Sequence, residues 1–304
     1  MLQEAFDRKQ VDVACSALVN DTAGTLMSNA YGVGETLAGV IFGTGTNGAY
    51  VENLTQVAKM HALSNEGAVD VSKSQAAGLD KMVINTEWGG FDDSRKVLKY
   101  TTFDSAVDRT SINVRKHAFE KMISGMYLGE VTRRVILHLV DSQILFGGYS
   151  SGALNTHYGL DTAIMSKLEA AEGKTDTEAI ARLRKVILED LAIEEEHVSE
   201  ADCLAVARVS EIVGTRGCRL SACALAATLI QTGTDKSNKR VTFGADGSLV
   251  EFYPRFNERV MGALSELVGD ECTKRVDMTL AKDGSGVGAA LCAQAAKKQL
   301  ESGL

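Results

Sequence analysis

Apolar and polar positions in the first part of the chain alternate as they do in strands, with turn residues between the runs. Residues 13–19 are small or β-branched and end at a polar pair, which predicts a strand. Residues 22–31 predict a short helix with Asp21 as its N-cap. Residues 37–42 and 49–51 flank a glycine-rich turn, as the two arms of a hairpin do.

The next stretch adds one strand between two polar connections. Residues 81–85 are largely apolar or β-branched and end at a polar turn, so they predict a third strand. Residues 64–80 and 92–115 are polar and carry no clear period, which is typical of surface connections.

The spacing of apolar residues becomes helical from Lys116 onward. Apolar side chains recur every three or four positions, which predicts a core-facing helix that runs to about His138 or beyond. Glu120 lies beside this apolar stripe, where a carboxylate could face a pocket. Further helices are predicted over residues 162–171, 176–189, 200–231 with a break near Gly214, 256–267 and 285–300, and strands over residues 240–243, 248–252 and 275–280.

The order of these elements indicates the class of fold. Three strands are followed by helices, and strands and helices then alternate to the end of the chain. A mixed sheet with helices packed on both faces accommodates this order. We therefore predict an α/β fold, and we find no repeat or linker that divides the sequence.

Composition and charge narrow the class of protein. The 304 residues are 45% hydrophobic and carry a net charge of −8, which disfavours a nucleic-acid partner because phosphate binding needs a basic surface. The longest apolar stretch, residues 222–230, is too short to cross a bilayer. The first residues contain no apolar signal core. We expect a cytoplasmic protein without membrane insertion.

The cysteines indicate neither a zinc site nor a disulfide framework. Six are scattered without a Cys-x-x-Cys pair, and no histidine lies at zinc-ligand spacing. We expect free core thiols in a reducing compartment and assign no residue to a metal site.

Two features near the N-terminus suggest a common chemistry. Asp21 follows the first predicted strand, where a carboxylate can take a proton from a substrate hydroxyl. An N-cap is its alternative role, and the two are compatible. The turn Gly43-Thr44-Gly45-Thr46-Asn47-Gly48 can bring backbone N–H groups close to phosphate oxygens, although a plain hairpin turn also explains it. Together they suggest phosphoryl transfer to an alcohol.

Three other turns offer groups for a polyol or a nucleotide. Glu87 follows the third strand beside the only tryptophan, and a carboxylate can hold sugar hydroxyls, although a solvated turn carboxylate is the alternative. Gly244 and Gly247 could let an adenine or ribose lie flat on the backbone, or they could form a hairpin turn. Residues 283–286 open the last helix and are either an anion site or a packing loop.

These motifs, taken in order, resemble one family, the eukaryotic hexokinases, glucokinases included. Any single match could be chance, but six in the family's order and spacing are highly specific. The matching segments are Leu18-Val19-Asn20-Asp21-Thr22, Phe42-Gly43-Thr44-Gly45-Thr46-Asn47, Asn85-Thr86-Glu87-Trp88-Gly89, Phe119-Glu120-Lys121-Met122-Ile123-Ser124-Gly125, Gly244-Ala245-Asp246-Gly247-Ser248 and Asp283-Gly284-Ser285-Gly286.

The resemblance implies a fold, a reaction and a set of site residues. The fold is the actin-like ATPase fold of ribonuclease-H-like lobes, with a hexose such as glucose and ATP with Mg²⁺ as partners. The reaction transfers the γ-phosphoryl group to the 6-hydroxyl of the sugar, the first step of glycolysis. Asp21 matches the general base. The sugar-binding positions are Asn20, Asn47, Glu87 and Glu120, and the nucleotide-binding positions are Gly43, Thr44, Gly45, Thr162, Ser166, Gly244 and Ser248.

One departure from the family pattern concerns its smaller, N-terminal lobe. That lobe carries an Asp-x-Gly-Gly-Thr phosphate loop and a Thr-Lys pair, and neither occurs ahead of Asn20. We expect residues 1–304 to correspond to the large lobe, with 1–21 as the strand leading from the small lobe and 285–304 as the C-terminal helix. Because phosphoryl transfer depends on positioned donors and excluded water, turnover by this chain alone should be orders of magnitude slower. A non-catalytic hexose- or nucleotide-binding module is the alternative.

Overall fold

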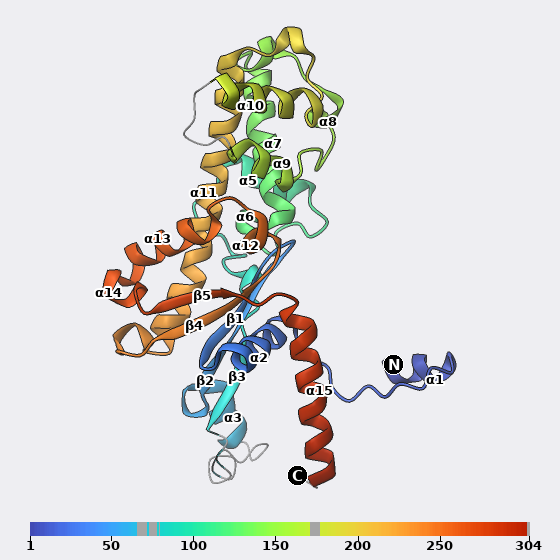
Figure 1. Cartoon of the computed structure of the whole chain (residues 1–304), viewed down its shortest axis with the longest axis vertical. Helices are drawn as coiled ribbons and strands as arrows, with labels where there is room; N and C mark the ends of the chain where they lie inside the picture. The colour runs from blue at the N-terminus through green and yellow to red at the C-terminus, as the bar shows by residue number, and fades with distance from the viewer. Residues whose placement is uncertain (66–71, 73–77, 79, 171–176, 303–304) are drawn as a thin grey trace.

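The computed structural model describes residues 1–65, 72, 78, 80–170 and 177–302, and its centre is a five-stranded mixed sheet (Figure 1). β1 pairs antiparallel with β2 and parallel with β4, which in turn pairs parallel with β5. The predicted α/β class with a mixed sheet is confirmed. In the spatial order of the sheet, the strands are β3 (Lys81–Asn85), β2 (Thr46–Asn53), β1 (Thr36–Phe42), β4 (Val241–Asp246) and β5 (Val276–Leu280).

The central strand β1 is buried on both faces. Val40 and Phe42 are fully enclosed on one face. On the other face, a Cβ on Gly39 would lie 2.3 Å from the backbone nitrogen of Leu26, so α2 packs directly on the strand. In the hairpin register, Val40 lies opposite Gly48 and Phe42 opposite Thr46, so residues 43–45 form the turn. The predicted hairpin and third strand are both confirmed.

Helices lie on both faces of the sheet. α2 (Asp21–Val33) packs on β1 and β4, and α15 (Gly284–Ser302) packs against α2. On the other face, α13 (Phe256–Val268) places the ring of Phe256 5.4 Å from that of Phe42. The predicted final helix is therefore confirmed and ties the end of the chain to its first sheet-packing helix (Figure 1).

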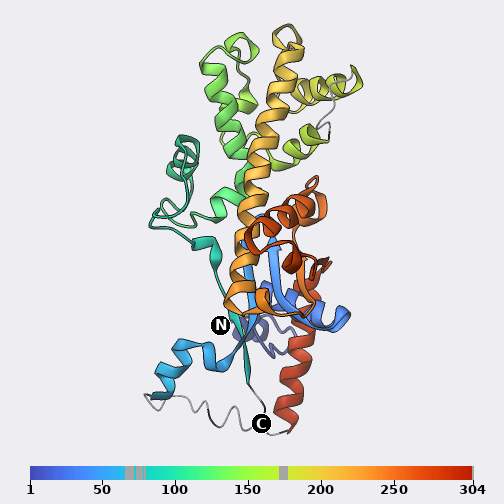
Figure 2. The ribbon, with the colours of Figure 1, turned by 90° about the vertical axis from the view of Figure 1, so that its left-hand side faces the viewer.

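A helical extension rises from the sheet around one long helix, α11 (Glu200–Gln231) (Figure 2). Its hydrophobic core is continuous with the core above the sheet. The other helices of the extension are α5 (Thr102–Thr110), α6 (Glu120–Ile123), α7 (Gly125–Asp141), α8 (Gly152–Asn155), α9 (Thr162–Glu169) and α10 (Thr177–Glu189). The remaining short elements of the described chain are α1 (Leu2–Arg8), α3 (Ala58–Asn65), α12 (Ser248–Phe252), α14 (Asp270–Thr273) and 3-10 turns at Leu54–Gln56, Trp88–Gly90, Phe146–Gly148, Glu195–His197 and Thr234–Lys236.

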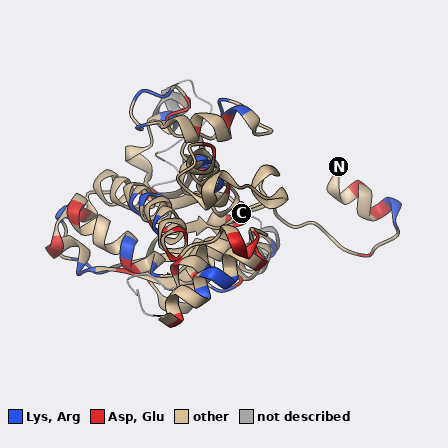
Figure 3. Cartoon of the chain, turned by 90° about the horizontal axis from the view of Figure 1, so that it is seen from above, with Lys and Arg blue, Asp and Glu red and all other residues tan. Residues whose placement is uncertain are grey.

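The strand predicted over residues 13–19 is wrong. Residues 11–20 have no regular structure, and this segment extends away from the rest of the chain with α1 at its end (Figures 1 and 3). Its backbone bonds locally instead, because the Gln3 side chain donates to the carbonyl of Val13 and accepts from the N–H of Cys15. A strand needs a pairing partner, and composition alone does not supply one.

Two predictions about long helices are also wrong. The helix predicted from Lys116 to about His138 is interrupted at Ser124, which is extended between α6 and α7. The predicted break near Gly214 is absent from the described α11, which is continuous. A Cβ on Gly214 would lie 2.2 Å from the hydroxyl of Tyr253 and 2.6 Å from Oε1 of Glu169, so this glycine makes room for packing.

Other short elements also differ from the prediction. Residues 248–252 form α12 and not a strand, since a segment of five residues with three apolar positions does not distinguish the two. The supposed connection over 92–115 contains α5, which begins with a capping box between Thr101 and Asp104. The connection over 64–80 lies mostly outside the described residues.

Surface charge and cysteines agree with an ordinary globular domain. Acidic and basic residues occur together on most segments seen in Figure 3. All six cysteines are free; Cys203, Cys218 and Cys272 are buried, whereas Cys15 and Cys223 are exposed. Burial raises the pKa of the Cys218 thiol to about 12, so this side chain stays protonated at neutral pH. Within the described part of the chain, no helix is both long and apolar enough to span a membrane.

Candidate functional site

The loops that follow β1 and β4 meet at one edge of the sheet. These strands are parallel and in register up to Ile41 and Asp246. A Cβ on Gly43 would lie 3.3 Å from the Cα of Gly247, so the two loops touch. The carboxyl ends of adjacent parallel strands are where ligands bind in open α/β sheets. We therefore expect a ligand site at the carboxyl ends of β1 and β4.

The turn after β1, residues 43–45, is held against the start of α7. The N–H of Gly125 donates to the carbonyl of Gly43 at 2.7 Å, and the N–H of Met126 donates to that of Thr44 at 3.2 Å. In a continuous helix, these two N–H groups would instead donate to carbonyl groups of the preceding helical turn. The interruption at Ser124 is therefore what lets α7 hold this turn.

A small cavity of about 290 Å³ lies on one side of this turn. All five residues predicted for the base and the sugar line it, although they come from widely separated parts of the sequence. This "small cavity" is lined by Asn20, Asp21, Ile41, Gly45, Thr46, Asn47, Glu87 and Glu120.

Hydrogen bonds between side chains fix one wall of the small cavity. The amide of Asn47 donates to Oε1 of Glu87 at 3.1 Å and to Oδ1 of Asn85 at 2.8 Å. The amide of Asn85 donates to the same oxygen of Glu87 at 2.7 Å. Glu87 itself has a φ of 50°, an uncommon value for a residue other than glycine. The wall therefore presents the Glu87 carboxylate and the Asn47 amide in a defined arrangement, held by bonds to Asn85.

Glu120 forms another wall. Its Oε2 accepts the N–H of Thr46 at 3.1 Å, so the carboxylate bridges α6 and β2. The next residue, Lys121, is 3% exposed and donates to Oδ1 of Asp108 at 2.8 Å. Hydrogen bonds to Lys121 and Arg95 hold the pKa of the Asp108 carboxyl below its usual value, although burial opposes them. A buried ion pair thus supports the helix that carries Glu120.

Asp21 is the first residue of α2, and the N-cap is Asn20. Oδ1 of Asn20 accepts the N–H of Thr22 at 3.0 Å, and Oδ1 of Asp21 accepts the same N–H at 2.8 Å. The predicted cap was therefore misplaced by one residue. The carboxylate of Asp21 is exposed at a helix N-terminus, where negative charge is favoured.

A second, large cavity of about 540 Å³ adjoins the other side of the turn. Its walls are largely apolar, and four predicted nucleotide residues, Thr44, Thr162, Ser166 and Ser248, line it. This "large cavity" is lined by Thr44, Gly125, Met126, Tyr158, Leu160, Asp161, Thr162, Ala163, Ser166, Ser248, Leu249, Phe252 and Tyr253.

Gly244 is separated from the other nucleotide candidates. It lies inside β4, where a Cβ would come within 2.5 Å of the Cβ of Asn29. Its lack of a side chain therefore serves the contact between β4 and α2. Gly43 contacts the loop after β4, and it is not one of the described residues that line either cavity.

Thr162 lines the large cavity, but its hydroxyl is already engaged. It donates to the carbonyl of Gly125 at 2.6 Å and accepts the N–H of Gly129 at 2.9 Å. This pair joins α9 to the first turn of α7. We therefore assign Thr162 to shaping the cavity.

Sequence reasoning missed several residues that build these walls. Asn85 belongs to the Glu87 motif, but its bond to Asn47 depends on the pairing of β2 with β3. The indole of Trp88 donates to the hydroxyl of Thr46 at 2.9 Å and fixes the start of β2. Tyr253 lines the large cavity while its hydroxyl donates to Glu169, and burial raises its pKa. Of these residues, only Trp88 carries a signal in the sequence, an aromatic side chain beside two glycines.

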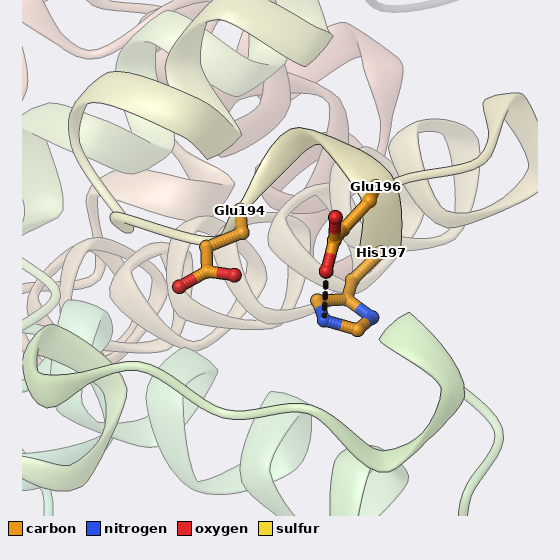
Figure 4. Close-up of side chains that lie close together, drawn as sticks. All are labelled: Glu194, Glu196 and His197. Atoms are coloured by element: carbon orange, nitrogen blue, oxygen red, sulfur yellow. Dashed lines mark ion pairs between the residues drawn. The ribbon is translucent and has the colours of Figure 1, made fainter.

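One group of potential metal ligands lies apart from the two cavities. Among the described residues, Glu194, Glu196 and His197 place ligand atoms within 4.8 Å of one another (Figure 4). Both glutamates are exposed, and His197 pairs with Glu196 at 3.5 Å and stacks on Tyr149 at 3.8 Å between ring centroids. Charge pairing and stacking account for this group, and we assign it no metal.

Solved structures of known proteins share the fold of this chain. The chain is 34% identical to a Schistosoma mansoni hexokinase solved in complex with glucose, with a TM-score of 0.81 over 97% of this chain and 61% of that one. A second hexokinase crystal structure has a TM-score of 0.77 at 31% identity, over 96% of this chain and 57% of that one. The fold is thus an α/β lobe of the actin-like ATPase kind.

Sequence relatives identify the family. Models described as hexokinase match residues 37–295 and 1–31. A glucokinase from Aspergillus niger is 40% identical over 98% of this chain and 61% of its own length. Hexokinase-2 of Schizosaccharomyces pombe is 35% identical over 98% of this chain and 60% of its own. The chain belongs to the hexokinase family, and it spans about three fifths of the length of these relatives.

Proposed function

We propose that the chain binds a hexose, with glucose the first choice, in the small cavity and ATP with Mg²⁺ in the large cavity. It would carry the residues that direct the γ-phosphoryl group to the 6-hydroxyl of the sugar. The observation that carries the proposal is the turn at residues 43–45, which contributes Gly45 to the small cavity and Thr44 to the large one. Two ligands bound there would meet at this turn.

The small cavity suits a polyol. Carboxylates and amides hold neighbouring hydroxyls in directed pairs. The lining side chains of Asn47 and Glu87 are already ordered by hydrogen bonds to each other and to Asn85. Glu120 adds a carboxylate whose direction is set by Thr46. Preorganised side chains bind with a smaller loss of conformational entropy.

The large cavity suits a nucleotide. Its volume lies in the range of cofactor sites, and its apolar wall at Leu160, Leu249 and Phe252 can cover a base. Thr44 and Ser248 place hydroxyls beside the turn where phosphates would lie. Mg²⁺ would be held mainly by the phosphates, with few protein ligands, and would neutralise their charge.

Asp21 is our candidate for the base. A carboxylate beside a bound sugar hydroxyl can accept its proton as the phosphoryl group arrives. It shares the small cavity with the four sugar candidates, Asn20, Asn47, Glu87 and Glu120, so this role requires no rearrangement of the sheet.

A second candidate function is a hexose-binding module with little turnover. The exposure of Asp21 and Glu87 favours it, because water in the site weakens the interactions that stabilise the transition state. Cytoplasmic location remains a prediction under either function.

Calorimetric titration with glucose and a coupled assay of glucose-dependent ADP formation separate these functions. We expect saturable glucose binding. Asp21→Asn should lower turnover about a hundredfold to ten-thousandfold while changing glucose affinity little. Asp141→Asn, an exposed aspartate at the end of α7, is the matched control and should leave both unchanged. Binding without turnover would favour the module, and absence of binding would contradict both functions.

A further inference from the structure

His117 stands just before the helix that carries Glu120. It lies near the end of the segment that connects Trp88–Gly90 to α6. This segment projects to one side of α11 (Figure 2). Its φ is 55°, and its carbonyl accepts the N–H of Lys121 at 3.1 Å, so its backbone is fixed to the first turn of α6. The side chain is 45% exposed, and its Nδ1 lies 3.9 Å from Oε1 of Glu120.

The two oxygens of Glu120 are engaged differently. Oε2 accepts the N–H of Thr46, whereas Oε1 has only His117 as an ionic neighbour in the described structure. Oε1 is therefore the oxygen left to accept a hydrogen bond from a ligand hydroxyl in the small cavity. The charge on the His117 ring therefore acts directly on Oε1 of Glu120.

We infer that His117 is a positioning residue of the small cavity and acts through Glu120. When its ring is protonated, it draws Oε1 of Glu120 into an ion pair and weakens that oxygen as an acceptor. When the ring is neutral, Oε1 is available to a sugar hydroxyl. The inference rests on the proposed function, because it requires a hexose in the small cavity.

Charged groups from several elements lie around His117. Histidine ordinarily titrates between pH 5 and 8, whereas carboxylates titrate below that range. Glu120 faces the ring from α6, and Asp93 lies nearby because its Oδ1 accepts the N–H of Ala118 at 2.8 Å. Lys116 precedes it in sequence, and Glu87 lies across the same cavity.

The test is glucose binding measured calorimetrically from pH 5.5 to 8, which requires no turnover. In the unmodified chain, affinity should fall about twofold to fivefold from pH 7.5 to 5.5, the size expected of a partly exposed ion pair. His117→Gln should abolish this dependence and keep the higher affinity at pH 5.5. Glu120→Gln should bind more weakly at every pH and show no such dependence.

His157→Gln is the matched control. His157 is 54% exposed, and its Nδ1 lies 3.8 Å from a carboxylate oxygen of Glu130, outside the small cavity. This variant should keep the pH dependence of the unmodified chain. An unchanged profile in His117→Gln, or a flat profile in the unmodified chain with clear binding, would overturn the inference alone. No binding at any pH would overturn the proposed function and the inference with it.

Discussion

The small and large cavities share the turn at residues 43–45, but their polar groups are engaged in different directions. In the small cavity, the lining residues Asn47 and Glu87 bond to each other, and both bond to Asn85 beside them, so the wall is ordered by its own hydrogen bonds. In the large cavity, Thr162 and Tyr253 turn their hydroxyls back into the protein and present the rest of the side chain. The small cavity can therefore form directed hydrogen bonds to a ligand, whereas the large cavity recognises a ligand mainly by the shape of its wall.

A different buried ion pair lies behind each of the two cavities. A buried pair of Asp108 and Lys121 lies behind the small cavity and fixes α6. Behind the large cavity, Glu130 is 1% exposed, bonds to Arg133 and accepts the N–H of Tyr158 at 2.8 Å. Removing support from one side should therefore impair one ligand more than the other, which mutations can test.

The largest expected effect is that of Asp108→Ala. The change leaves the buried ammonium of Lys121 without its partner, which typically costs about 3–5 kcal/mol. Urea unfolding should show this loss, and glucose binding by the folded fraction should weaken more than ATP binding. Asp277→Ala is the matched control, because its pair with Arg240 at 3.5 Å is exposed and contributes at most about 1 kcal/mol. Equal losses in the two variants would contradict the role of burial.

Titration of the same carboxylate should have a smaller effect than its deletion. The pKa of Asp108 is lowered in the folded chain, mainly by hydrogen bonds to Lys121 and Arg95 against the penalty of burial. A lowered folded pKa gives stability that is present above the unfolded value, near 4, and lost as pH falls below it. Unfolding free energies from pH 7 to 3 should fall at the acid end, and less steeply in Asp108→Asn. An identical acid slope in that variant would assign the loss to other carboxylates.

Gly129→Ala should disturb the large cavity alone. A Cβ at this position would lie 2.2 Å from the carbonyl oxygen of Leu160 and 2.8 Å from the nitrogen of Thr162, so the wall must move. Overpacking of this kind costs about 1–3 kcal/mol. ATP binding should weaken while glucose binding persists, as measured by calorimetry. Gly262→Ala, in α13 with nothing within 4 Å of the added Cβ, should instead stabilise by up to about 1 kcal/mol.

How far the sequence predicts this molecule depends on the range of the interactions involved. The strands β1, β2 and β3 are predicted because apolar patterning and turn residues are local. Ser124 is different, because α6 and α7 separate in order to bond a turn about 80 residues earlier, which no local pattern reveals. Gly214 resembles a helix breaker in sequence, but the packed Tyr253 gives it another purpose.

The candidate site divides in the same way. Motifs in the family's order led to five residues that line one cavity, although no local property of Asn20 or Glu120 predicts that they meet. The nucleotide role of Gly244 stays a prediction, because a glycine that admits a neighbouring helix, as this one does, and one that admits a ligand have the same sequence signal. Asn85 and Trp88 were overlooked as contributors. Asn85 accepts a hydrogen bond from Asn47 through the pairing of β2 with β3, and Trp88 donates to Thr46 of β2 from the turn that follows β3.

The smallest expected effect separates two roles of one residue in the small cavity. Asn20 caps α2 through its Oδ1, and its amide nitrogen is a donor that a sugar could use. Asn20→Ala should lose both, with about 1 kcal/mol of stability and weaker glucose binding. Asn20→Asp keeps a good cap but no donor, so it should retain stability and still bind glucose weakly. The single tryptophan, Trp88, bonds to Thr46, a residue that lines the small cavity, and its fluorescence provides the binding signal. If Asn20→Asp bound glucose as the unmodified chain does, the amide would have no part in recognition, and the ordered wall around Glu87 would have to account for it.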